Sequence, residues 1–93
     1  MKYSIERTTQ FKKDFKLAEK QGLDMAELEK VIAILANGDT LPQEYRDHEL
    51  KGDYVGYREC HIEPDWLLIY KIYENVLILS LVRTGSHSRL FKK

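Results

Sequence analysis

The run of residues 66–73, Trp-Leu-Leu-Ile-Tyr-Lys-Ile-Tyr, most strictly limits what this chain can fold into. Apart from Lys71 the run is apolar, so a strand formed here needs cover on both of its faces. Such a strand suits the centre of a sheet, with helices packed on one side. The other predicted elements must therefore surround it.

Shorter segments predict the other strands of this sheet, at residues 2–7, 48–50, 57–63 and 76–82. Pro64 and Asp65 mark a tight turn before the central run, and Asn75 lies in the turn after it. Because short turns join antiparallel neighbours, the sequence predicts a mainly antiparallel, twisted sheet of four to five strands.

Two amphipathic helices are predicted between the first strand and the others. Phe11, Phe15 and Ala18 recur at helical spacing and form the apolar stripe of the first helix, which ends at Gly22. A short connection to the second helix favours a helical hairpin.

The second helix has signals at both ends. Asp24 is the expected N-cap, and Glu27 three residues later completes a variant of the capping box. Gly38 follows its last apolar residues and ends it. We therefore expect one α+β domain over residues 1–93, in which the N-terminal strand and the helical hairpin pack on one face of the sheet. The other face is left for a site.

Charge is unevenly placed in a chain whose formal net charge is zero. Residues 1–20 carry six Lys or Arg against three Asp or Glu, and residues 83–93 carry four basic residues and no acid. The two basic ends could meet as one phosphate-facing surface, or they could be two solvated termini.

The cellular compartment is indicated by the lack of a second cysteine and of a long apolar segment. The single Cys60 excludes an internal disulfide and favours a reducing cytoplasm. No window approaches the roughly 18 apolar residues that a membrane span needs, so no membrane association is expected.

The three histidines, His48, His61 and His87, are the clearest candidates for chemistry. Asp65 follows His61 across the predicted turn and could orient or charge-tune an imidazole. A lone histidine is more often structural or solvated. Three histidines and an aspartate could bind zinc, but the spacing matches no H-x₃-H or C-x₂-C pattern, so we expect neither metal nor other cofactor.

These residue types fit RNA cleavage without a metal. A base takes the proton of a ribose 2′-OH, a cation stabilises the phosphorane, and an acid protonates the departing 5′-oxygen. Trp66 and Phe91 could stack on bases, and Arg83 could contact phosphate. The plainer alternatives are a core role for Trp66, tail docking for Phe91 and a simple strand-end cation for Arg83.

The whole chain resembles the RelE/ParE superfamily of type II toxin–antitoxin toxins, and within it the YafQ branch. The resemblance rests on the segments at residues 11–14, 48–52, 58–70 and 81–91. It implies a RelE-like microbial RNase fold and an endoribonuclease that cleaves messenger RNA in the ribosomal A site. It also implies a cognate antitoxin partner, and contact with operator DNA only through the toxin–antitoxin complex.

Carried over to this sequence, the resemblance places the active site on six residues: His48, His61, Asp65, Trp66, His87 and Phe91. In that assignment His87 is the general acid, and His61 and Asp65 act with His48 on the 2′-OH and the phosphate. Trp66 and Phe91 position nucleotides, and Arg83 contacts phosphate. The alternatives are a ParE-like toxin that binds DNA gyrase without cutting RNA, which does not need the histidines, and an inert interaction domain.

Overall fold

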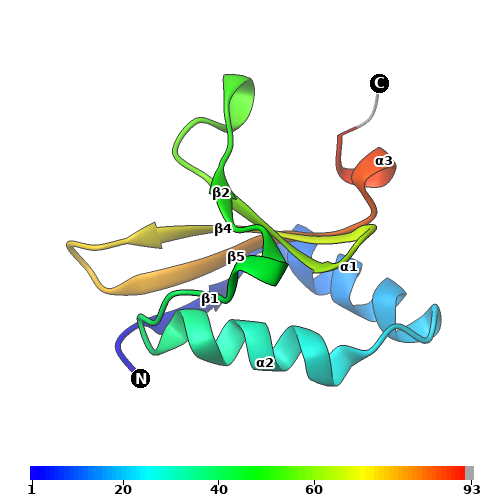
Figure 1. Cartoon of the computed structure of the whole chain (residues 1–93), viewed down its shortest axis with the longest axis horizontal. Coiled ribbons are helices and arrows are strands. Elements are labelled where there is room, and N and C mark those ends of the chain that lie inside the picture. Colours follow the sequence, from blue (N-terminus) through cyan, green and yellow to red (C-terminus); the bar gives the residue numbers. More distant parts are fainter. Residues whose placement is uncertain (92–93) are drawn as a thin grey trace.

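The computed structural model describes residues 1–91 and has a five-stranded sheet at its centre (Figure 1). The strands are β1 (Ser4–Arg7), β2 (His48–Glu49), β3 (Arg58–Glu63), β4 (Trp66–Tyr73) and β5 (Ile78–Gly85). Their order across the sheet is β1-β5-β4-β3-β2. The β1–β5 pair is parallel and the other pairs are antiparallel. The predicted α+β class, the mainly antiparallel sheet and the place of residues 66–73 between two other strands are confirmed.

The last strand differs from its predicted bounds of 76–82. Val76 and Leu77 are exposed and belong to the β4–β5 turn, where Leu77 adopts a left-handed conformation (φ 53°). The strand therefore begins later, at Ile78, and continues to Gly85. Arg83 consequently lies within β5, close to its end, and not after it.

Five helical segments complete the fold. They are α1 (Thr9–Lys20), α2 (Met25–Ala36), the 3₁₀ turns η1 (Gln43–Tyr45) and η2 (Gly52–Tyr54), and α3 (His87–Leu90). The helical hairpin of α1 and α2 lies below the sheet in Figure 1, while α3 and the β2–η2 segment rise above it. None of the helices within residues 1–91 is long and apolar enough to cross a membrane.

Helix ends follow the predicted capping residues, with one exception. The hydroxyl of Thr8 accepts the N–H of Phe11, and the carboxylate of Asp24 accepts the N–H of Glu27. The predicted return bond from Glu27 to the start of α2 is replaced, because this carboxylate accepts the Tyr45 hydroxyl at 2.6 Å. That hydrogen bond raises the pKa of Tyr45 to about 12.

The two faces of the sheet carry apolar clusters of unequal size. Leu68 and Tyr70 point to the helical hairpin and belong to the main core. Leu67 and Ile69, which alternate with them along β4, point to the other face, where a smaller cluster includes Leu90 of α3. The face that was predicted to be free therefore has α3 packed over part of it.

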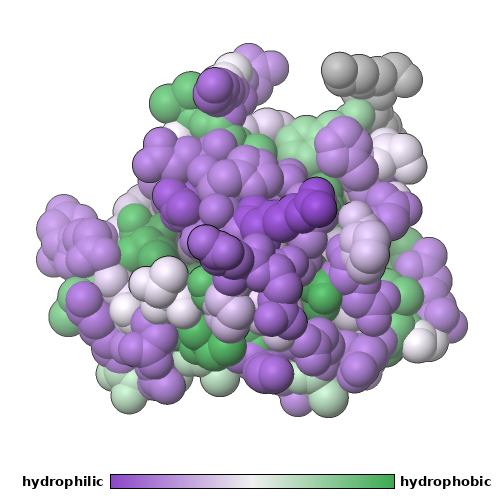
Figure 2. Space-filling model, viewed as in Figure 1, coloured by the Kyte–Doolittle hydropathy of each residue, from purple (hydrophilic) through white to green (hydrophobic). Residues whose placement is uncertain are grey.

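Much of the surface near this second face is polar. In the view of Figure 2, hydrophilic side chains gather over η1 and β2, and apolar surface shows lower down beside α2. The basic C-terminal end predicted from the sequence includes Lys92 and Lys93, which lie outside the described residues.

Candidate active site

Two of the predicted histidines meet on the second face of the sheet, around a carboxylate that the sequence did not single out. His48 pairs with Glu59 across β2 and β3, and His61 lies two residues further along β3 on the same face. The Nε2 atoms of His48 and His61 lie 3.4 and 3.6 Å from Oε1 of Glu59. The ring centroids are 6.3 Å apart. We call His48, Glu59 and His61 the sheet cluster.

Exposure within the sheet cluster is graded. The side chain of Glu59 is 6% exposed, that of His61 is 23% exposed and that of His48 is 50% exposed. The carboxylate therefore lies beneath the two imidazoles, which face the solvent. A buried carboxylate in this place fixes both rings from below.

Backbone carbonyls hold the other nitrogen of each ring. Nδ1 of His48 lies 2.7 Å from the carbonyl oxygen of Arg46, and Nδ1 of His61 lies 3.4 Å from that of Pro64. Because a carbonyl only accepts, Nδ1 of His48 carries a proton.

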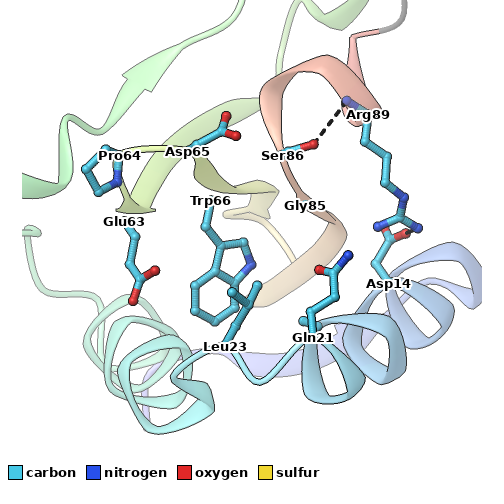
Figure 3. Close-up of a pocket in the computed structure, with 11 residues that line it drawn as sticks. Asp14, Gln21, Leu23, Glu63, Pro64, Asp65, Trp66, Gly85, Ser86 and Arg89 are labelled. Atoms are coloured by element: carbon cyan, nitrogen blue, oxygen red, sulfur yellow. Dashed lines mark hydrogen bonds and ion pairs between the residues drawn. The ribbon is translucent and has the colours of Figure 1, made fainter.

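His87 is placed by different means. It is the first residue of α3 and is exposed, and its backbone N–H donates to Oδ1 of Asp65 at 3.3 Å. Asp65 was expected to orient or charge-tune an imidazole. In the structure its carboxylate accepts this N–H at the start of α3. Figure 3 shows Asp65 on the β3–β4 turn.

Phe91, the second aromatic residue predicted for the site, lies beside His87. Its ring centroid is 5.1 Å from that of His87 and 5.5 Å from that of Tyr54, which it meets edge-on at 77°. Tyr54 comes from η2 and was not predicted as a site residue. The two aromatic rings are partly exposed and lie next to a candidate acid.

Trp66 does not fit its expected role in stacking on a base. It is 2% exposed and belongs to the main core. Its Nε1–H donates to the hydroxyl of Thr84 at 2.9 Å, and that hydroxyl donates to the carbonyl of Leu67. At 2% exposure Trp66 is best described by the plainer alternative, a core residue, although its ring also lines the cavity drawn in Figure 3.

Arg83 is engaged by an acid and does not point freely at the solvent. Its Nε and Nη2 donate to the two oxygens of Asp14 on α1 at 3.0 and 3.1 Å. Burial by itself raises the pKa of Asp14, but hydrogen bonds from Arg83, the Thr84 N–H and Gln10 outweigh it and leave the pKa lowered. Asp14 likewise raises the pKa of Arg83.

The same carboxylate also binds Arg89. Nη2 of Arg89, on α3, donates to Oδ1 of Asp14 at 2.6 Å. Asp14 and Arg89 border a cavity of about 330 Å³ between the end of α1, the β3–β4 turn and α3 (Figure 3). The basic end of the chain thus does meet the first helix, but through a buried acid.

The geometry agrees with comparisons of the whole chain with known proteins. Residues 3–92 match a family model described as bacterial toxin of type II toxin-antitoxin system, YafQ. The chain belongs to the YafQ family of bacterial toxins.

Relatives of the YafQ family support the assignment over nearly the full length. The mRNA interferase toxin YafQ of Escherichia coli K12 is 46% identical over 88 residues, which cover 94% of each chain. A crystal structure of YafQ from E. coli BL21(DE3) superposes with a TM-score of 0.90 at 43% identity, covering 96% of this chain and 98% of that one. YafQ in the E. coli DinJ-YafQ complex gives a TM-score of 0.88 at 44% identity, again covering 96% and 98%.

Two residues of this candidate site were missed by sequence reasoning. Glu59 had a usable signal, since it shares a strand face with His61 and lies in the strand that pairs with the one containing His48. Asp14 had none, because the two arginines that bind it are 69 and 75 residues away in the sequence. Within residues 1–91 no group of three or more His, Cys, Asp or Glu side chains is placed to hold a metal ion.

Proposed function

We propose that this protein is an endoribonuclease, an mRNA interferase, that acts by general acid–base chemistry. The observation that carries the proposal is the sheet cluster, in which two imidazoles share one buried carboxylate on the face where α3 presents His87. Imidazoles are suited to proton transfer at neutral pH. The E. coli relative at 46% identity has the name mRNA interferase toxin, which supports the same activity here.

In the proposed reaction a base of the sheet cluster, His48 or His61, takes the proton of a ribose 2′-OH. The 2′-oxygen attacks the adjacent phosphorus, and the bond from phosphorus to the 5′-oxygen breaks. His87 gives a proton to that departing oxygen. The products are a 2′,3′-cyclic phosphate and a 5′-OH end, so neither an oxidant nor a second reactant is required.

Binding of the substrate is assigned to groups around α3. Phe91 and Tyr54 offer rings on which flanking bases stack. Arg83 and Arg89 share one carboxylate, Asp14, so one positive charge is left uncompensated, and we assign the phosphate contact to Arg83. Asp65 acts by holding His87 in place and not as a proton carrier.

The proposed partners are those expected of a toxin of this family. We propose that the messenger RNA is cut in the ribosomal A site and that a cognate antitoxin neutralises the toxin, as the E. coli complex of YafQ with DinJ suggests. Operator DNA is contacted only through the toxin–antitoxin complex.

The test is to induce the protein briefly and to map RNA 5′ ends, with His87→Ala at equal expression as control. New ends in frame with codons and carrying a 5′-OH are expected only for the unmodified protein. Growth arrest with intact messenger RNA and broken DNA would contradict the proposal and favour a gyrase-binding toxin. Absence of toxicity would favour an inert domain.

A further inference from the structure

The helix that holds His87 is too short to be stable alone. α3 spans four residues, one turn, whereas isolated helices shorter than about 12 residues are marginal in water. Its position must therefore come from contacts with the rest of the protein. The structure gives it three: Asp65 at its start, Leu90 beneath it and Arg89 at its side.

The Arg89 contact leads to a buried acid with an unusual number of partners. The side chain of Asp14 is 0% exposed, and a carboxylate in such a place requires compensation. It receives two hydrogen bonds from Arg83, one from the Thr84 N–H at 3.2 Å, one from Gln10 at 3.3 Å and one from Arg89. One carboxylate on α1 thus joins the end of β5 to α3.

The way in which α3 packs leaves little freedom for an alternative position. A Cβ atom added at Gly85 would lie 3.1 Å from Nη1 of Arg89 and 3.3 Å from Cδ2 of Leu90. Arg89 and Leu90 therefore press directly onto the backbone at the end of β5. Figure 3 shows Arg89 extending from α3 down to Asp14, alongside this backbone.

We propose that Asp14 is a positioning residue for the reaction, which binds Arg89 and thereby fixes α3 and the place of His87. The catalytic part of this inference rests on the proposed function of His87. The part that concerns the position of α3 rests on the contacts alone. Asp14 itself is buried and touches no substrate. Arg89 connects Asp14 to α3, and Arg83 binds the same carboxylate from the end of β5.

Two variants separate this role from others. Asp14→Asn keeps both arginines but removes the charge that holds them, and Arg89→Ala removes only the connection to α3. The matched control is Val31→Ala, which opens a cavity in the main core under α2, far from α3. It destabilises the fold without touching the Asp14 contacts.

The first measurement is the imidazole NMR signal of each histidine in the free protein, which needs no enzymatic activity. In Asp14→Asn and in Arg89→Ala the His87 signal should shift and broaden, while the signals of His48 and His61 stay in place. Val31→Ala should leave all three unchanged. An unmoved His87 signal in both folded variants overturns the inference, whatever the protein does to RNA.

The second measurement is the single-turnover rate of cleavage on programmed ribosomes at saturating protein, with ribosome affinity determined separately. A misplaced proton donor should lower this rate by about 10- to 100-fold in both variants, with affinity nearly unchanged. If Arg89 instead contacts RNA, Asp14→Asn retains the rate and only Arg89→Ala binds more weakly, which contradicts the inference. If the unmodified protein cuts no RNA, the proposed function fails and the NMR result alone decides on the positioning role.

Discussion

The sheet cluster and α3 contribute the two halves of the proposed site in different ways. His48, Glu59 and His61 lie on paired strands, so their mutual geometry follows from the register of β2 and β3. His87 lies on a single helical turn whose position depends on three separate contacts. The proposed reaction needs a base and an acid at a fixed distance. The site thus combines a rigid half, the sheet cluster, with a tethered half, α3 and its His87.

The largest expected effect is on the tethered half itself. His87→Ala should lower the single-turnover cleavage rate by about 10²–10⁴-fold, because the leaving 5′-oxygen loses its proton donor. The fold should be unchanged, since His87 is exposed. Rate measurements on ribosomes together with a thermal unfolding curve check both statements. A rate within about two-fold of the unmodified protein would remove His87 from the mechanism.

Asp14→Asn should have the largest effect on stability, about 3 kcal/mol at neutral pH, because two arginines lose their buried acid. The lowered pKa of Asp14 gives the effect a pH dependence. The carboxylate stabilises the fold above its unfolded pKa of about 4, and this contribution is lost as the pH falls through the lower folded value.

The difference in the free energy of unfolding between Asp14→Asn and the unmodified protein should therefore become smaller as the pH falls. Urea unfolding of both proteins at pH 7 and below pH 4 measures the difference. A difference that stays constant with pH would contradict the role of the Asp14 charge.

Within the rigid half, Glu59→Gln should lower the cleavage rate by about 10- to 100-fold, since an amide cannot hold both imidazoles as a carboxylate does. Here the NMR signals of His48 and His61 should move and that of His87 should stay, the reverse of the pattern for Arg89→Ala. Movement of all three signals would show that the two halves are not independent.

Trp66→Phe tests whether the indole serves the core or the RNA. Loss of its hydrogen bond to Thr84 and some packing should reduce the free energy of unfolding by about 1–3 kcal/mol, with little change in cleavage. Stacking on a base would instead appear as weaker RNA binding with stability preserved. Chemical denaturation and a binding titration on the same preparations separate the two.

The smallest effect is expected for Asp65→Asn. The amide oxygen can still accept the N–H of His87, so cleavage should fall only a few-fold. In Asp65→Ala, which removes the acceptor, the cleavage rate should fall about ten times further. Equal and severe losses in both variants would mean that the charge of Asp65 takes part in proton transfer.

Much of the architecture could be predicted because it is encoded locally. The capping by Thr8 and Asp24 depends on neighbouring residues, and the two-sided apolar run of β4 has one consistent place in a sheet. The parallel pairing of β1 with β5 has no such signal, since Ile78, the partner of Ser4, lies 74 positions further along the chain and no turn specifies the contact.

The candidate site could be predicted only in part, for the same reason. The histidines are visible in the sequence because few residue types transfer protons at neutral pH. The partners of these histidines are acids among 15 Asp and Glu residues. Alternation along the strand places Glu59 on the face of His61, but only the folded register pairs it with His48. Burial of Trp66 and the two arginines on Asp14 likewise depend on long-range packing.

The parallel pairing of β1 and β5 has a consequence for the order of events during synthesis. The first strand leaves the ribosome long before β5, its partner strand among the described residues, has been made, so this pair cannot form until β5 has emerged. α3, which follows β5, can settle on Asp14 only after that. The position of His87 is therefore among the last features of the fold to be established during synthesis.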